Sequence, residues 1–173
     1  MSQVNNFSQP FRIGLGQDHH RLLAQKLNTS GCPLTLGGYV IPDQELSLEA
    51  NSDGDVILHA LCNTLSSALG GGSLSTISDP LCQQGITDSR QYLEYFLKLV
   101  EQANYQISNL SVSLEALQPK LETHRQKITE SLARILGLEV NQIGLTFTSG
   151  EGLTACGRGE GIAAQVIILL QHV

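Results

Sequence analysis

The spacing of apolar residues along the chain changes between two periods, and each period predicts one kind of element. Alternation of apolar and polar residues is typical of strands, whereas apolar residues three and four apart are typical of helices. Alternating or long apolar segments predict strands over residues 11–17, 107–117, 143–147 and 162–170. The helical period predicts helices over residues 56–69, 88–103 and 121–136.

Glycine, proline and short polar residues mark where these elements end. Two apolar arms flank Gly37-Gly38, so residues 34–41 are expected to form a short hairpin or a bulged strand. Ser52-Asp53 is the expected N-cap of the first helix, and Gly70-Gly71-Gly72 ends that helix. Residues 74–87 contain Asp-Pro and an isolated glycine, and a loop is expected there.

The order of these elements is β-β-α-α-β-α-β-β and predicts an α/β (α+β) fold. We expect one mixed β-sheet with helices packed on one face, formed by a single domain over residues 11–173. Residues 1–10 are polar and are expected to be disordered or loosely ordered. A chain of 173 residues with 41% hydrophobic residues is long enough and apolar enough for one such core.

The chain has few charged residues, and acidic residues outnumber basic ones. Asp, Glu, Lys and Arg make up 15% of the residues, where about 25% is usual for a soluble domain. Self-association that hides part of the surface, including the apolar segment 162–170, would account for the deficit. The net charge is −6 and no Lys/Arg cluster occurs, which excludes nucleic acid as a partner.

Membrane insertion and export are not expected either. No apolar run approaches the roughly 20 residues that cross a bilayer. The N-terminal residues lack the apolar stretch of a secretory signal. The four cysteines show no C-x-x-C spacing and are expected to be reduced thiols, so a cytoplasmic location is predicted.

Asp18-His19-His20 follows the first expected strand and is a candidate for metal binding. Residues two apart on an extended segment point to the same side, so Asp18 and His20 can converge while His19 faces away. A carboxylate and an imidazole suit a divalent ion such as Zn²⁺. Two polar surface residues at a strand end are the alternative.

A second candidate lies at the start of the first helix, where Asn51-Ser52-Asp53-Gly54-Asp55 is followed by His59. His59 is one turn after Asp55 and is expected on the same face. Asp18, His20 and His59 would give the three ligands of a zinc site with one open position, and uncapped amides at the Ser52 turn would bind an anion. The alternative is an ordinary helix start. A calcium loop is excluded, since Val56 stands where it needs glycine.

A third candidate is the glycine-rich loop that follows the strand over 143–147. Thr148, Ser149, Glu151 and Arg158 offer hydroxyls, a carboxylate and a guanidinium that can hold a phosphate and Mg²⁺. A plain connection between two strands is the alternative, and the segment lacks the lysine and spacing of a P-loop.

In order and spacing, these segments resemble the 2-C-methyl-D-erythritol 2,4-cyclodiphosphate synthase family of the non-mevalonate isoprenoid pathway. The resemblance extends from Arg12 to Leu170. Its blocks are RIGLGQDHH (12–20), LGG (36–38), NSDGDVILHAL (51–61), TDSR (87–90), QPK (118–120) and GRGEGIA (157–163). Membership implies a homotrimer with active sites between subunits, and a reaction that closes a diphosphocytidyl substrate into a cyclic diphosphate with release of CMP.

The resemblance also implies a role for each candidate residue. Zn²⁺ would be bound by Asp18, His20 and His59, and a second ion, Mg²⁺ or Mn²⁺, by Glu151. Asn51 and Ser149 would be the catalytic residues at the reacting phosphates. The substrate would be bound by Asp18, His20, Asn51, Ser52, Ala116, Pro119, Lys120, Leu121, Thr148, Ser149, Glu151 and Arg158. Arg158 and Glu160 would lie near the threefold axis.

The chain departs from the family pattern at several positions, although all the implied metal ligands are present. Asn51 stands where the family usually has His, and Asn63 and Ser73 stand where it has Asp. The acidic loop for the erythritol is shortened to residues 77–80, with Asp79 as a substitute, and Gly150 and Ala155 replace a Thr and a Phe. We interpret this as an active, divergent branch. The alternative is a non-catalytic phosphate- or nucleotide-binding homologue with a structural metal. Such a homologue would not need Glu151 as the ligand of a second metal.

Overall fold

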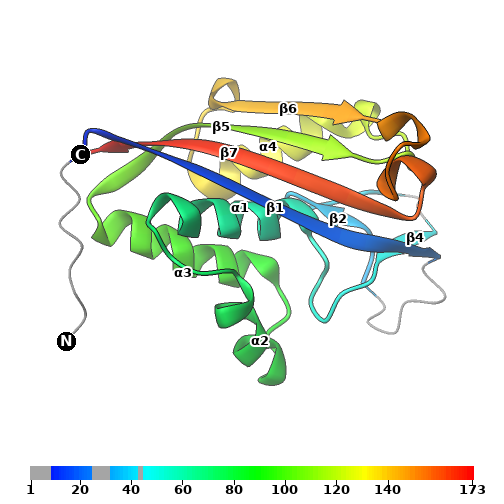
Figure 1. Ribbon diagram of the computed structural model, residues 1–173, viewed down its shortest axis with the longest axis horizontal. Coiled ribbons are helices and arrows are strands. Elements are labelled where there is room, and N and C mark those ends of the chain that lie inside the picture. Colours follow the sequence, from blue (N-terminus) through cyan, green and yellow to red (C-terminus); the bar gives the residue numbers. More distant parts are fainter. Residues whose placement is uncertain (1–8, 25–31, 43–44) are drawn as a thin grey trace.

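The computed structural model describes residues 9–24, 32–42 and 45–173, and these form one α+β domain. Its main sheet has five strands in the order β4-β1-β7-β5-β6 (Figure 1). The strands are β1 (Phe11–Ala24), β4 (Leu46–Leu48), β5 (Tyr105–Glu115), β6 (Ile143–Thr148) and β7 (Gly161–His172). The sheet is mixed, because β5 and β6 are parallel while the other neighbours are antiparallel.

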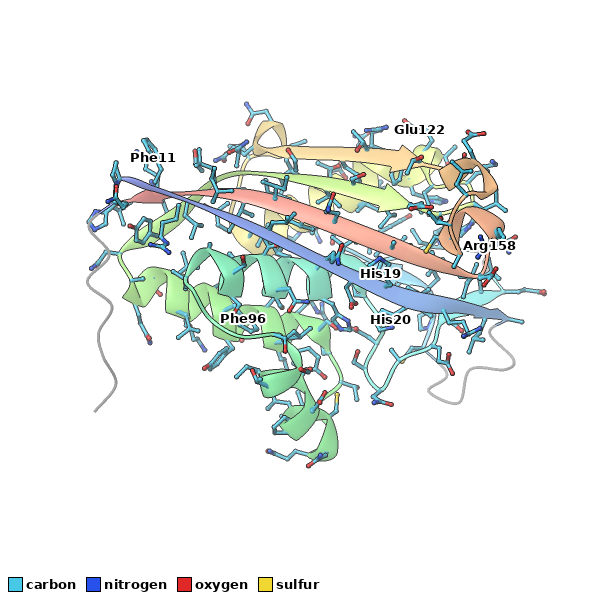
Figure 2. All side chains as sticks on the ribbon, viewed as in Figure 1. Phe11, His19, His20, Phe96, Glu122 and Arg158 are labelled. Carbon is cyan, nitrogen blue, oxygen red and sulfur yellow. The ribbon has the colours of Figure 1, made fainter. Side chains whose placement is uncertain are left out.

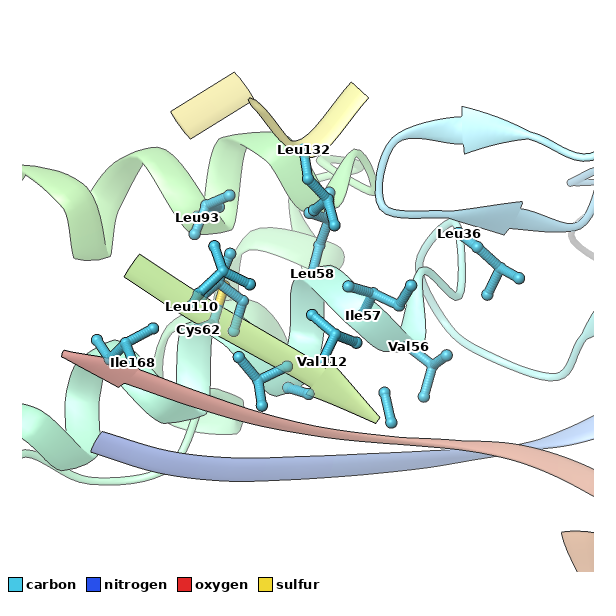
Figure 3. Packing of buried hydrophobic residues seen from close by; sticks show 14 of the residues in the cluster. Leu36, Val56, Ile57, Leu58, Cys62, Leu93, Leu110, Val112, Leu132 and Ile168 are labelled. Atoms are coloured by element: carbon cyan, nitrogen blue, oxygen red, sulfur yellow. The ribbon is translucent and has the colours of Figure 1, made fainter. Parts of the chain in front are cut away.

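The helices pack against one face of this sheet, as the sequence predicts. They are α1 (Val56–Ala68), α2 (Ser75–Gln83), α3 (Ser89–Gln102) and α4 (Arg125–Leu136). Short 3-10 turns precede and follow α4, η2 (Glu122–His124) and η3 (Val140–Gln142), and two more lie between β6 and β7, η4 (Gly150–Gly152) and η5 (Cys156–Arg158). Helix α1 lies between the sheet and α3 (Figure 1). Its apolar residues, such as Ile57, Leu58 and Leu61, are fully buried against strand residues such as Val112 and Ile168 (Figure 3).

Two glycines of β1 allow α1 to lie directly against the sheet. A Cβ atom at Gly14 would lie 2.1 Å from the carbonyl oxygen of Thr64, and one at Gly16 would lie 2.4 Å from that of Ala60. Any other residue would push the helix away. Because β1 continues into Asp18 and His20, this close contact fixes the distance between those side chains and α1.

The opposite face of the sheet is open and partly apolar in the single chain. Phe11, Ile13 and Leu15 of β1 are 54%, 71% and 52% exposed, and Ile167 of β7 is 48% exposed. Ile13 pairs with Leu169, and Leu15 pairs with Ile167, so these side chains form one continuous patch. We call these five residues the open apolar face.

The expectation that association hides the apolar segment 162–170 is therefore wrong for five of its nine residues. The even-numbered positions Ile162, Ala164, Val166, Ile168 and Leu170 are buried within the subunit's own core. Strand β7 is covered by helices on one side, so its odd-numbered side chains alone remain available to a neighbour.

The structure also corrects several element boundaries. The expected loop over 74–87 contains α2, in which Ile77 and Leu81, four residues apart, pack against the core. Strand β1 extends to Ala24, so Asp18 and His20 lie within it, and the three-residue edge strand β4 was not predicted. The hairpin around Gly37-Gly38 is confirmed as β2 (Thr35–Leu36) and β3 (Tyr39–Val40), which form a separate two-stranded sheet.

The first helix begins at Val56, as predicted, but its capping residue differs from the predicted one. Its N-cap is Asp55 rather than Ser52-Asp53, and the buried Asp55 carboxylate accepts hydrogen bonds from the amides of Ile57 and Leu58. It also accepts from the amides of Gly37 (2.9 Å) and Gly38 (2.6 Å), which ties the hairpin to α1. Asp55 therefore belongs to the scaffold, because backbone amides occupy its carboxylate.

The expectation of a loosely ordered segment over residues 1–10 falls mainly on residues 1–8, which lie outside the described residues. Pro10 and Gln9 are described, and their carbonyl groups accept hydrogen bonds from the His172 amide and the Tyr105 hydroxyl. In the described part of the chain, no helix is both long enough and apolar enough to cross a membrane.

Candidate metal centre

Asp18, His20 and His59 converge at the contact between β1 and α1. Asp18 Oδ2 lies 2.9 Å from His20 Nε2 and 3.0 Å from His59 Nδ1, and the two imidazole nitrogens are 3.0 Å apart. His19, between the two β1 residues, is exposed and lies on the other face of the strand (Figure 2). The prediction that alternation brings Asp18 and His20 together, with His59 from the helix, is confirmed.

These three atoms fit a divalent ion. Within the described residues they form a group whose possible ligand atoms all lie within 4.8 Å of one another. Two ligands of one tetrahedral Zn²⁺, each bonded at about 2.0–2.2 Å, lie about 3.3–3.6 Å apart, so the atoms here would need to separate by only a few tenths of an ångström. One carboxylate and two imidazoles are a common zinc donor set, and three protein ligands leave a position for a substrate oxygen.

Both histidines are oriented by groups on their far side. The backbone carbonyl of Glu49 accepts a hydrogen bond from His20 Nδ1 at 2.8 Å, which leaves Nε2 of that ring directed at the triad. His59 Nε2 lies 2.7 Å from Ser89 Oγ and 3.2 Å from Ser52 Oγ, which leaves Nδ1 directed at the triad. Such outer contacts fix the imidazole tautomer that binds a metal.

The charge state of the triad favours cation binding. Burial alone would raise the pKa of Asp18, but hydrogen bonds from His20 and His59 outweigh burial and hold that pKa well below its usual range. Burial alone would lower the pKa of His20, but its hydrogen bond to Asp18, the negative charge of Asp18 and the hydrogen bond to the Glu49 carbonyl together outweigh burial and raise that pKa. A carboxylate held ionised between two imidazoles is a strong cation ligand, and a bound metal would take the place of the imidazole protons.

A cavity of about 270 Å³ opens beside the triad. Asn51 and Ser52 line it, together with Asn63, Ser73 and Asp79. Helix α2, which the sequence analysis did not predict, adds Ser75, Ser78 and Cys82 to the wall. The cavity is therefore lined mainly by neutral hydroxyl and amide groups apart from the triad and Asp79.

The expected anion site from uncapped amides is not formed. The amides of Ile57 and Leu58 donate to Asp55, that of Asp55 donates to Asp53, and that of Gly54 donates to Ser52 Oγ. The amide of Asp53 donates to the carbonyl of Thr87. These amides are thus already bound by Asp53, Asp55, Ser52 and the Thr87 carbonyl, and they are not available to an anion.

A second cavity, of about 160 Å³, lies between the end of β5 and the end of β6. Its lining includes the predicted substrate residues Ala116, Pro119, Lys120, Leu121, Thr148 and Ser149, together with Leu114, Glu122 and Phe147. It shares no lining residue with the cavity beside the triad. The structure thus gathers the predicted site residues into two groups within one subunit.

Glu151 and Arg158 lie in the turns η4 and η5 between β6 and β7. Glu151 is exposed, adopts a positive φ of 48°, and accepts a hydrogen bond from Ser149 Oγ at 3.0 Å. Arg158 pairs with Glu160 at 2.8 Å. Neither side chain lines the cavity beside the metal triad.

The sequence analysis missed two residues that support the triad, Ser89 and Asp53. Ser89 is the first residue of α3 and is fully buried, and Asp53 accepts from its backbone amide at 2.9 Å and from its hydroxyl. The available signal was the TDSR block, which contains a serine directly after a helix-capping aspartate.

Comparison with known proteins extends over nearly the whole chain. A family model described as the YgbB family matches residues 11–171. A relative from Francisella philomiragia is 39% identical over 163 residues, which cover 94% of this chain and 99% of the relative. One from Chlamydia trachomatis serovar A is 37% identical over 163 residues, covering 94% and 89%. Both relatives are named 2-C-methyl-D-erythritol 2,4-cyclodiphosphate synthase.

Solved structures give the same result. A Plasmodium falciparum IspF in complex with CDP has a TM-score of 0.80 at 28% identity, covering 95% of this chain and 99% of that one. A 2C-methyl-D-erythritol-2,4-cyclodiphosphate synthase has a TM-score of 0.80 at 36% identity, covering 92% and 100%. Sequence, fold and the metal triad agree, and the chain belongs to the YgbB family, in which its curated relatives are cyclodiphosphate synthases.

Proposed function

We propose that this protein converts 4-diphosphocytidyl-2-C-methyl-D-erythritol 2-phosphate to 2-C-methyl-D-erythritol 2,4-cyclodiphosphate and releases CMP. The observation that carries the proposal is the Asp18–His20–His59 triad beside an open cavity, in a chain of this family. A 2-phosphate oxygen of the substrate forms a bond to the β-phosphorus, and the bond from that phosphorus to the α-phosphate oxygen breaks. The electron pair leaves with CMP and no water is consumed, so the enzyme is a phosphorus–oxygen lyase.

The chain's contribution is alignment and neutralisation of charge, since the nucleophile belongs to the substrate. Asp18, His20 and His59 would hold Zn²⁺, and Glu151 would hold a second ion, Mg²⁺ or Mn²⁺. When bound, such ions neutralise phosphate charge and hold the reacting oxygens in line. The protein supplies no side-chain nucleophile.

Asn51 and Ser52 are the residues we assign to the attacking phosphate. Both line the cavity beside the triad, and Ser52 Oγ is 3.2 Å from His59 Nε2. The Asn51 amide can donate a hydrogen bond to a phosphate oxygen but carries no positive charge. Ser149 and Thr148 would contact the diphosphate from the second cavity.

The second cavity suits the cytidine end of the substrate. Leu114, Ala116, Pro119, Leu121 and Phe147 give it apolar walls, and Lys120 places a positive charge at its edge. Flat apolar walls with one cation match a pyrimidine ring that carries a phosphate.

We further infer that the active enzyme is a homotrimer with active sites between subunits. The metal cavity and the nucleotide cavity share no residue within one chain, although one substrate must contact both. The open apolar face offers a surface for a second copy, and an exposed apolar patch of this kind marks an interaction site. In this arrangement Glu151 reaches the metal triad of a neighbour, and Arg158 and Glu160 lie near the threefold axis. Sedimentation at micromolar concentration should give a trimer, and a monomer would contradict this inference.

We also infer a cytoplasmic location. Cys62, Cys82 and Cys156 are free thiols. Reduced cysteines are usual in a reducing compartment.

The function is tested by incubating the purified full chain, loaded with Zn²⁺ and Mg²⁺, with the diphosphocytidyl substrate. The expected result is stoichiometric release of CMP and formation of the cyclic diphosphate, both resolved by ³¹P NMR. Tight binding of CDP without release of CMP would instead favour the non-catalytic homologue with a structural metal.

A further inference from the structure

We propose that Ser89 and Asp53 are positioning residues that hold His59 in the tautomer whose Nδ1 binds the metal. The inference rests on the metal site of the proposed function, but it concerns residues that touch neither the metal nor the substrate. The relevant contacts form a chain from Asp53 through Ser89 to His59.

The series of contacts is short, and it is buried at its Ser89 and His59 end, while Asp53 is half-buried. Ser89 Oγ lies 2.7 Å from His59 Nε2 and donates a hydrogen bond to Asp53 Oδ1. The other carboxylate oxygen of Asp53 accepts from the Ser89 backbone amide at 2.9 Å. Ser89 is fully buried and His59 is 7% exposed, so these groups exchange partners with water rarely.

The Asp53 carboxylate sets the donor-to-acceptor direction of each hydrogen bond in this series. A carboxylate can only accept hydrogen bonds, so the Ser89 hydroxyl must donate its proton to Asp53. The oxygen of that hydroxyl then accepts from His59 Nε2–H. With a metal bound in place of the proton between Nδ1 and Asp18, the neutral imidazole carries its one proton at Nε2, and the Nδ1 lone pair points into the triad.

The contact between Ser52 and His59 does not fix which of the two groups donates the hydrogen bond. Its Oγ is 3.2 Å from His59 Nε2 and already accepts from the Gly54 amide at 3.3 Å. A hydroxyl without a carboxylate behind it can rotate and donate to Nε2 instead. The selective element is therefore the Asp53–Ser89 pair, which also joins the segment before α1 to the start of α3.

The experiment measures Zn²⁺ affinity of the full chain by competition with a chelator, without substrate. Ser89→Ala removes the acceptor for His59 Nε2–H. Asp53→Asn keeps the shape of the side chain but replaces one acceptor oxygen with a donor nitrogen. If that nitrogen faces the Ser89 hydroxyl, the hydroxyl turns its proton toward His59. If it faces the Ser89 amide, two donors oppose each other. Each variant should bind Zn²⁺ about 10- to 100-fold more weakly than the wild type.

Ser47→Ala is the matched control. Ser47 is also fully buried, and its hydroxyl has no hydrogen-bond partner among the described residues. This variant should bind Zn²⁺ within about twofold of the wild type, since the hydroxyl it loses makes no contact with a metal ligand. If Ser89→Ala fails to fold by circular dichroism, Asp53→Asn decides the outcome.

Two readouts separate positioning from a general structural effect. In the double variant the losses should not multiply, because Asp53 acts on His59 through Ser89. Imidazole ¹⁵N NMR of the zinc-loaded chain should show His59 protonated at Nε2 in the wild type, and a smaller share of this form in Asp53→Asn at the same zinc concentration. Unchanged Zn²⁺ affinity in both single variants, or losses that multiply, would overturn the proposal. The assay contains no substrate, so its outcome is independent of whether CMP is released.

Discussion

The two halves of the proposed active site differ in how firmly their own subunit holds them. In the metal half, Asp18, His20 and His59 have side chains 25%, 17% and 9% exposed, and each imidazole is oriented from behind by a further group. In the loop half, Glu151 is exposed, and the hydrogen bond that the structure shows at its carboxylate comes from Ser149 two residues away. The metal half is therefore held in place by its own subunit, whereas the position of the Glu151 side chain depends on what the loop contacts.

The difference follows from the elements that carry each half. The triad lies where glycines bring β1 against the buried helix α1, so the core itself fixes its geometry. Glu151 lies between Gly150 and Gly152, all three with positive φ, in a connection made of 3-10 turns. The proposed site between subunits would use this division, because a neighbour would complete its loop half.

Removal of a metal ligand should give the largest effect. His59→Ala leaves two protein ligands, and we expect loss of bound zinc and at least about a 10³-fold fall in kcat, since a metal contributes several kcal/mol to the transition state. The fold should persist, because α1 keeps its other buried residues. Zinc content by atomic emission and circular dichroism check both points, and full zinc occupancy in this variant would refute the ligand role of His59.

Mixing two inactive variants tests whether the two halves of one active site come from different subunits. His59→Ala damages the metal half and Glu151→Ala damages the loop half, so each homotrimer should be inactive. If each active site takes its halves from different subunits, refolding a 1:1 mixture should restore roughly one quarter of the wild-type activity by random pairing. Activity no greater than the sum of the two pure variants would place both halves in one subunit.

Two glycines that flank Glu151 offer a matched test of the loop half. A Cβ atom at Gly150 would lie 2.0 Å from Glu115 Oε1 and 2.8 Å from Gly157 Cα, whereas one at Gly152 would meet no atom within 4 Å. Both have positive φ, 68° and 75°, so both alanine variants carry similar backbone strain. Gly150→Ala must also move the loop.

We expect Gly150→Ala to lower kcat by about 10- to 100-fold, which is the effect of misplacing a catalytic group by about 1 Å. Gly152→Ala should stay within about threefold of the wild type, because it adds backbone strain without a clash. Zinc content should be unchanged in both, since neither glycine contacts the triad. Equal losses of kcat in the two variants would mean that strain, rather than the contact with Glu115, controls the loop.

The metal half could be predicted from sequence because local rules determine it. Alternation along a strand brings Asp18 and His20 to one side, and residue types near a helix start add His59. The predicted strands, the mixed sheet and the helices on one face follow from periodicity in the same way. The cap of the first helix did not follow, because the Asp55 carboxylate accepts from the amides of Gly37 and Gly38, which are distant in sequence.

Helix α2 and the supporting pair Ser89–Asp53 escaped prediction for a related reason. Residues 75–83 are rich in Ser, Thr, Asp and Pro, which favours a loop, and tertiary packing of Ile77 and Leu81 outweighs that preference. The contact between Asp53 and Ser89 joins residues 36 apart, and no local pattern encodes it. How the loop half meets a neighbour depends on a second chain, and periodicity within one chain carries no information about it.

The smallest expected effect is at Asp88, which caps α3 beside Ser89 and tests whether helix stability and metal positioning are separable. Its side chain accepts from the Arg90 amide at 2.9 Å at an exposed helix end. Asp88→Ala should lower the free energy of unfolding by about 1 kcal/mol with zinc content unchanged, whereas Asp88→Asn should retain most of the cap. Urea denaturation at equal protein concentration measures both.

The difference in stability between the wild type and Asp88→Ala should change with pH in one direction. A hydrogen bond from the Arg90 side chain lowers the pKa of Asp88 below its ordinary value. A depressed carboxyl pKa stabilises the fold above the pKa of the unfolded chain, near 4, and that contribution is lost as the pH falls through the folded-state value. The gap between wild type and Asp88→Ala should therefore be full at pH 7 and narrow below about pH 4. A gap that widens in acid would show that Asp88 acts in another way than as a charged cap.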